Sequence, residues 1–163
     1  MKIILIILAV LVVVVGFEFV LTWRRINVGN ALADKAAKFK FERALPNAEK
    51  KILIIGDSTA VGTGASDPQF SIVGRVGKTF PAASITNLGV NGAKVHELIP
   101  RLEALKDQHF DLVMLHIGGN DVVRFTDLDQ LAASIATVID LAKSLSKNVT
   151  LTSTGNVGTA RLL

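Results

Sequence analysis

Three polar clusters in the second part of the chain contain residue types that can carry out acyl transfer. Ser58 offers a hydroxyl nucleophile, Gly92 can bring a backbone N–H close to a ligand because it has no Cβ, and Asn120 offers a side-chain amide. A serine hydroxyl can attack a carbonyl carbon, and uncharged N–H donors, including that of Ser58 itself, can stabilise the resulting oxyanion. One nucleophile with three donors predicts an acyl-transfer site, provided that the fold brings the clusters together.

The surrounding sequence predicts the elements that must position these clusters. Four short apolar runs, each bounded by Gly, Asn, Asp or Ser, predict buried strands at 51–56, 84–89, 111–117 and 148–153. Helical spacing occurs between them at 69–80, 95–106 and 128–146. This alternation predicts right-handed crossovers and a parallel sheet with helices on both faces. The carboxyl ends of such strands share one edge, where ligands of open α/β sheets bind.

The three clusters resemble the first three sequence blocks of the SGNH, or GDSL, hydrolase family. The matching strings are 54–58, 87–92 and 117–121, in the family's order and after successive strands. The resemblance implies a three-layer α/β/α, flavodoxin-like sheet with strand order 2-1-3-4-5. It also implies that Ser58 is the nucleophile and that the N–H groups of Ser58 and Gly92 and the amide of Asn120 form the oxyanion hole. Substrates would be carboxylic esters of lipid, thioester or acetylated-sugar type, hydrolysed without metal or cofactor.

Carboxylates adjoin this predicted site, and the family's general base is missing from the sequence. We expect Asp57 and Asp121 to support turns by hydrogen bonds rather than to act as an acid and base pair. Family members carry a late Asp-x-x-His block that supplies the base, and nothing after Asn156 provides it. We therefore expect that the carboxyl-terminal part of the fold is missing, that an open reading frame continues to such a block, and that this chain alone is severely impaired. A natural inactive relative is the alternative.

None of the three histidines is a strong substitute for that base. We expect His116, inside the third predicted strand, to be a buried histidine with satisfied hydrogen bonds, and His109 to lie at the opposite edge of the sheet. His96 follows Gly92 by four residues and is the candidate nearest the site. The preferred interpretation of His96 is a surface histidine.

The first residues predict a membrane anchor. Between Ile3 and Trp23 the only charged residue is Glu18, and a helix of this length is about 30 Å long, enough to cross the hydrocarbon core. Trp23 with the two arginines after it is typical of an interfacial anchor. A cleaved signal peptide competes, but its small-residue pattern at 31–33 lies too far beyond the apolar run. We predict an uncleaved single-pass anchor over residues 1–25.

A basic segment connects this anchor to the predicted domain. Residues 26–50 are interpreted as a juxtamembrane linker containing a short amphipathic helix at 30–43, solvated near anionic headgroups and ended at Pro46, and residues 51–163 as the incomplete hydrolase domain. The cations after the span favour the cytoplasmic face for the domain, whereas the family resemblance leans to the exported side. The side of the membrane therefore stays open.

Composition excludes several other classes of function. Lys and Arg number 18 against 14 for Asp and Glu, and the excess lies in residues 1–50, because residues 51–163 hold ten of each. A neutral domain offers no electrostatic footprint for nucleic acid. The absence of cysteine excludes disulfides and thiolate catalysis.

The glycines at 62 and 64 only weakly resemble a dinucleotide fingerprint. A non-catalytic, membrane-tethered binding module is the stronger alternative, and the oligomeric state is left undecided.

Overall fold

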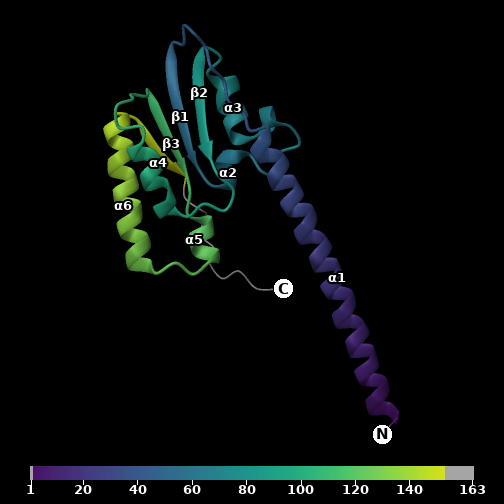
Figure 1. Ribbon diagram of the computed structural model, residues 1–163. Coiled ribbons are helices and arrows are strands. Elements are labelled where there is room, and N and C mark those ends of the chain that lie inside the picture. The colour runs from purple at the N-terminus through teal and green to yellow at the C-terminus, as the bar shows by residue number, and fades with distance from the viewer. Residues whose placement is uncertain (1, 153–163) are drawn as a thin grey trace.

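A computed structural model describes residues 2–152, which form one long helix joined to an α/β domain (Figure 1). The helix α1 spans Lys2–Lys38 without interruption and has no buried residue. The helix is long and apolar enough to cross a membrane, although a signal sequence near the amino terminus would have the same length and composition. The prediction of a separate amphipathic helix at 30–43 is wrong, because residues 30–38 belong to α1 and the helix ends at Lys38. No proline interrupts the chain before Lys38, so the apolar helix continues directly into the basic one.

Within residues 2–152, four parallel strands form a sheet in the order β2-β1-β3-β4. Their bounds are Lys50–Gly56 for β1, Ala83–Gly89 for β2, Leu112–His116 for β3 and Val149–Thr152 for β4. This arrangement confirms the predicted order for the first four strands. Residue 153, the predicted end of the fourth strand, lies outside the described residues. Gly56 at the end of β1 pairs with Gly89 on one side and His116 on the other.

Helices connect the strands, and all but the last are short: α2 (Ser58–Val61), η1 (Pro68–Phe70), α3 (Ile72–Thr79), η2 (Val95–Leu98), α4 (Ile99–Glu103), α5 (Gly119–Val123) and α6 (Leu128–Leu145). The predicted helices at 69–80 and 95–106 are each divided into a 3₁₀ turn and an α-helix. In the first, Ser71 caps α3 by accepting a hydrogen bond from Gly74 N at 3.0 Å. The two short helices α2 and α5 were not predicted, and both follow strands directly at the predicted site.

The sheet has an apolar layer on each face. Leu53 and Ile55 of β1 pack with residues of α4 and α6, whereas Ile52 and Ile54 pack with residues of α2 and α3. Successive side chains of a strand point to opposite faces, so a continuous apolar run in β1 indicates a strand covered on both faces. The three-layer α/β/α prediction is confirmed.

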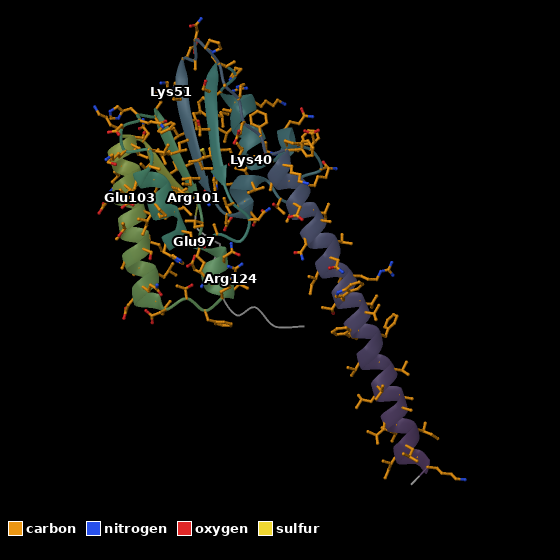
Figure 2. All side chains as sticks on the ribbon, in the orientation of Figure 1. Lys40, Lys51, Glu97, Arg101, Glu103 and Arg124 are labelled. Carbon is orange, nitrogen blue, oxygen red and sulfur yellow. The ribbon has the colours of Figure 1, made fainter. Side chains whose placement is uncertain are left out.

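The segment after α1 is bound to the domain, which corrects its interpretation as a solvated linker. Arg43 and Ile85 form an antiparallel bridge with N–O distances of 2.7 and 3.0 Å at the free edge of β2. The Arg43 guanidinium also donates to the carbonyl oxygens of Ala83 at 2.9 Å and Gly77 at 3.0 Å. Lys40 donates to the Asn87 carbonyl, and Figure 2 shows this lysine where α1 meets the sheet. The end of α1 is therefore fixed relative to β2.

Candidate active site

Ser58 is the first residue of α2 and lies immediately beyond the end of β1. Gly56 allows this turn, because a Cβ at that position would lie 1.9 Å from the carbonyl oxygen of His116. Asp57 N donates to the same oxygen at 2.8 Å, and its carboxylate caps α2 by accepting from Thr59 N at 2.8 Å. The first N–H groups of a helix have no carbonyl partner within it, so the N–H of Ser58 is available at the edge of the sheet.

Gly92 lies in the loop after β2, which is bound to the end of β1. Val90 N donates to Gly56 O at 2.9 Å, and Thr63 Oγ1 donates to Asn91 Oδ1 at 2.6 Å. Gly92 itself has φ of +77°, a backbone conformation that suits glycine. These contacts bring the Gly92 loop against both ends of α2.

Asn120 lies in the first turn of α5, directly after β3. Its Nδ2 donates to Ala93 O at 3.0 Å, next to Gly92 in the chain. A side-chain amide has two N–H donors, so this bond leaves one for a ligand. The structure thus joins the Ser58, Gly92 and Asn120 loops at one edge of the sheet, as the sequence analysis required.

The two acidic residues next to the candidate site accept hydrogen bonds from backbone N–H groups. Asp57 is buried and caps α2. Asp121 is also buried, and its Oδ2 accepts from Val95 N at 3.0 Å, which ties α5 to η2. Both carboxylates therefore position the loops that carry the site.

The histidines occupy three different environments. His116 is buried as predicted, but neither ring nitrogen has a hydrogen-bond partner within residues 2–152, so the expectation of satisfied hydrogen bonds is not met. Burial lowers its pKa below the ordinary value of 6.5, and the nearby Asp57 charge opposes this only in part. His96 is exposed on η2, and His109 is exposed before β3, at the opposite edge of the sheet.

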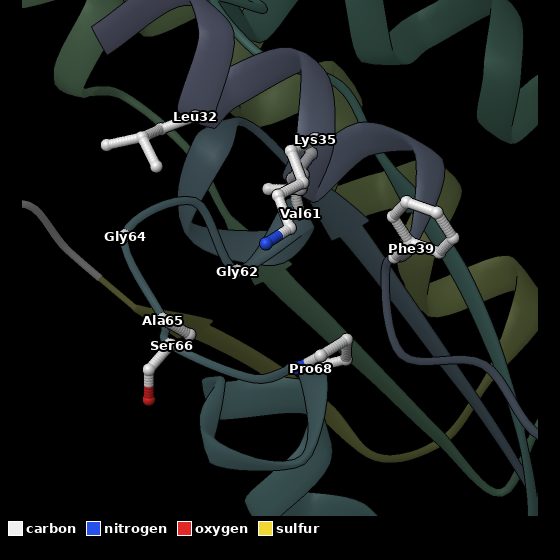
Figure 3. Close-up of a pocket in the computed structure, with 10 residues that line it drawn as sticks. Leu32, Lys35, Phe39, Val61, Gly62, Gly64, Ala65, Ser66 and Pro68 are labelled. Atoms are coloured by element: carbon white, nitrogen blue, oxygen red, sulfur yellow. The ribbon is translucent and has the colours of Figure 1, made fainter. Parts of the chain in front are cut away.

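The last turns of α1 also reach the site loops. Asn91 Nδ2 donates to the carbonyl oxygen of Ala33 in α1 at 2.8 Å. A cavity of about 220 Å³ lies between α1 and the α2–η1 loop (Figure 3). Its lining is mostly apolar and includes Leu32 and Phe39 from α1 and Val61 from α2, with the Lys35 amine pointing toward it. Ser58 is not among the lining residues, so this cavity lies beside the candidate site.

The sequence did not predict the contact between α1 and the site loops, nor the position of Arg124. A Cβ on Gly92 would lie 3.0 Å from a terminal guanidinium nitrogen of Arg124, which Figure 2 shows beside α5. The proximity of Arg124 depends on the unpredicted helix α5, so the sequence carried no signal for it. The sequence predicted an amphipathic helix that includes residues 32–39, but we expected this helix to be solvated rather than to line a cavity against the domain.

The glycines at 62 and 64 have a structural explanation. Gly62 is the C-cap of α2, with φ of +85°. Its N–H donates to Ser58 O at 3.0 Å, which closes the short helix. Gly64 has φ of +94° in the loop that follows. The two glycines thus form a helix end and a turn, which weakens the dinucleotide interpretation.

Comparison with known proteins identifies the family of this fold. The profile of the GDSL-like lipase/acylhydrolase family matches residues 54–162. The chain belongs to this family. The matched range covers more than half of the chain and includes all three loops that carry the SGNH blocks. The predicted resemblance to SGNH/GDSL hydrolases is thereby confirmed.

Solved structures agree with this assignment. Axe2, an acetylxylan esterase from Geobacillus stearothermophilus, is 26% identical, with a TM-score of 0.53 over 70% of this chain and 65% of that chain. The SGNH-hydrolase family esterase AlinE4 is 21% identical, with a TM-score of 0.57 over 66% of this chain and 60% of that chain. A lipolytic protein G-D-S-L family member from Veillonella parvula is 21% identical, with a TM-score of 0.54 over 62% of this chain and 56% of that chain.

The chain thus spans less than two thirds of the length of each of these three proteins. At 21% identity the second and third show similarity of fold alone. A search of curated protein sequences finds no match.

Proposed function

We propose that the protein is a membrane-anchored serine hydrolase of carboxylic esters, with Ser58 as its nucleophile. The observation that supports this most directly is the set of hydrogen bonds joining the three site loops: Val90 N to Gly56 O, Asn120 Nδ2 to Ala93 O, and Asp57 N to His116 O. They hold one hydroxyl and several free N–H donors at the carboxyl edge of a parallel sheet. Such an edge is where α/β proteins place their ligands.

In this mechanism Ser58 Oγ attacks the ester carbonyl carbon while a base removes its proton. The carbonyl oxygen becomes an oxyanion, which accepts hydrogen bonds from Ser58 N, Gly92 N and Asn120 Nδ2. The tetrahedral intermediate collapses by breaking the bond to the leaving alkoxide, which takes up a proton, and water then hydrolyses the acyl-serine. The base belongs to the Asp-x-x-His block typical of the family, which does not occur between residues 157 and 163.

The substrate class is an ester of lipid, thioester or acetylated-sugar type. Axe2, at 26% identity, supports the acetylated-sugar possibility. The apolar cavity beside α2 is compatible with an acyl group near the site.

The anchoring part of this proposal rests on α1. The helix has no buried residue, and its apolar part ends at Trp23 followed by two arginines. Apolar side chains exposed on every face of residues 3–23 favour a lipid environment over water. A chain beginning at Phe39 would keep the Arg43–Ile85 bridge and should lose its membrane association. Recovery of the full chain from the soluble fraction at its native size would contradict the anchor.

Hydrolysis is tested with p-nitrophenyl acetate in three proteins: this chain, its S58A variant, and the chain prolonged by an Asp-x-x-His block. The prolonged chain should show Ser58-dependent turnover. This chain should retain at most the acceleration of about a thousandfold over water that an oxyanion hole without a complete triad supplies. If Ser58→Ala leaves turnover of the prolonged chain unchanged, Ser58 is not the nucleophile. Robust Ser58-dependent turnover by this chain would show that a base lies within residues 1–163, and His96 would be mutated first.

A further inference from the structure

Four exposed apolar side chains lie at the carboxyl edge of the sheet, around the end of α5 and the start of α6. Their exposed fractions are 43% for Val122, 75% for Val123, 92% for Phe125 and 78% for Leu128. We call these four residues the apolar rim. Soluble surfaces carry single exposed apolar side chains, but four of them so close together in the chain indicate a contact with something apolar.

The backbone of Phe125 gives a second, independent observation. Phe125 has φ of +49°, and it is the only non-glycine residue with positive φ in the part of the chain that the structure describes. Phe125 N donates to Val122 O at 3.2 Å and Thr126 N to Asp121 O at 2.9 Å, the hydrogen-bond pattern of a Schellman cap. Glycine normally occupies this position, because a side chain is strained there. A phenylalanine that is both strained and exposed does not serve the stability of the fold.

The apolar rim and the membrane helix lie on the same side of the domain. In Figure 1, α5 and the loop to α6 are at the end of the domain toward which the amino-terminal part of α1 extends. The hydrogen bond from Asn91 to Ala33 and the Arg43–Ile85 bridge hold α1 against the domain, so this orientation is built into the fold.

The distance to the bilayer is also suitable. Ten residues of α1 separate Trp23 from Ala33, which corresponds to about 15 Å along the helix. The headgroup region on one side of a bilayer accounts for roughly 5–8 Å of that distance. The carboxyl edge of the sheet is therefore held close to the lipid surface.

We propose that the apolar rim docks onto the bilayer that α1 crosses and turns the carboxyl edge of the sheet, with Ser58, toward the lipid. The inference rests on the proposed anchoring by α1 and does not depend on hydrolysis. A protein partner fits less well, because stable protein interfaces use about 20–30 residues on each side. The acidic residues at 127 and 129 outnumber the cation at 124, so docking depends on apolar insertion rather than on attraction to anionic lipid.

The chain has no cysteine, so single-cysteine probes test the proposal directly. Val123→Cys, Phe125→Cys and Leu128→Cys are each labelled with an environment-sensitive fluorophore in the full chain, reconstituted in phosphatidylcholine vesicles. Gln108→Cys is the matched control, because Gln108 is exposed at the opposite edge of the sheet, just before β3. Circular dichroism establishes that each variant is folded.

Docking predicts blue-shifted emission at the three rim positions, strong quenching there by lipids carrying a nitroxide, and neither effect at position 108. Adding anionic lipid should change the quenching less than twofold. Emission like that of the control would overturn the proposal. A blue shift without quenching by lipid would also overturn it, since protein would then cover the apolar rim, either from the same chain or from a second copy. Flotation with the vesicles reports anchoring by α1 separately, so failure of the anchor is distinguishable from failure of docking.

Discussion

Gly56→Ala should destabilise the domain strongly, because the ends of β1 and β3 approach each other too closely for any side chain. The added Cβ would lie 1.9 Å from His116 O and 2.7 Å from its carbonyl carbon. Both are backbone atoms, so the strands themselves must separate by more than about 1 Å to reach ordinary contact. That separation breaks the 2.8 Å hydrogen bond from Asp57 N to His116 O. Overpacking of about 1–3 kcal/mol and an orphaned buried hydrogen bond of similar size together give a loss of about 2–6 kcal/mol.

Thermal unfolding of the full chain in detergent micelles, followed by far-UV circular dichroism, measures this loss. The single tryptophan, Trp23, lies on α1, so its fluorescence does not report on the domain. The expected loss corresponds to a decrease in Tm of about 8 °C or more. Gly29→Ala is the control, because nothing lies within 4 Å of its Cβ position and the domain should melt unchanged. A decrease of less than about 2 °C for Gly56→Ala would refute the close approach of the two strands.

Four further predictions concern the site and its supports. Asn87→Ala should destabilise the domain by about 2–4 kcal/mol in the same melting assay, because it orphans Ala60 O and Gly89 N, each bonded to Asn87 at 2.9 Å. Since burial lowers the pKa of His116, the unfolded chain binds the extra proton, so stability should decrease as the pH falls below about 6.5. His116→Leu should abolish that component in melts at different pH. Phe125→Gly should stabilise the domain by about 1 kcal/mol in melts, by relieving the positive φ. Asn120→Ala, in a form that turns over p-nitrophenyl acetate, should lower kcat by about a hundredfold or more.

A specific result would contradict each of these four predictions. Equal slopes of Tm against pH in His116→Leu and the parent would mean that folding leaves the pKa of His116 unchanged, against the lowering by burial. A lower Tm for Phe125→Gly would mean that the ring packs against the domain. An unchanged kcat for Asn120→Ala would remove its amide from the oxyanion hole, and an unchanged Tm for Asn87→Ala would show that water replaces its hydrogen bonds.

The strands could be predicted because buried parallel strands are short apolar runs with polar ends. The run at 52–55 is covered on both faces, so its continuous apolar character and its bounds agree with the structure. The helices were predicted less well. The helices α2 and α5 have only four and five residues, too few to show an apolar period, and α2 is bounded by its caps at Asp57 and Gly62.

The sequence pattern did not predict the long-range contacts between the linker and the domain. The cations at 40 and 43 were interpreted as a solvated basic segment, although both bind backbone carbonyls of the domain. Such contacts depend on where β2 leaves its edge unpaired, which residue types do not reveal. The candidate site residues could be proposed from the sequence because each follows a strand, whereas Arg124 approaches Gly92 through α5.

Covalent labelling of Ser58 tests the central claim most directly. The chain prolonged by an Asp-x-x-His block is treated with a fluorophosphonate, and the modified residue is located by peptide mass spectrometry. We expect one adduct on Ser58, its loss in Ser58→Ala, and its retention in Thr59→Ala, which removes the exposed neighbouring hydroxyl. An adduct that persists in Ser58→Ala, or that maps to a residue outside the three site loops, would contradict the account.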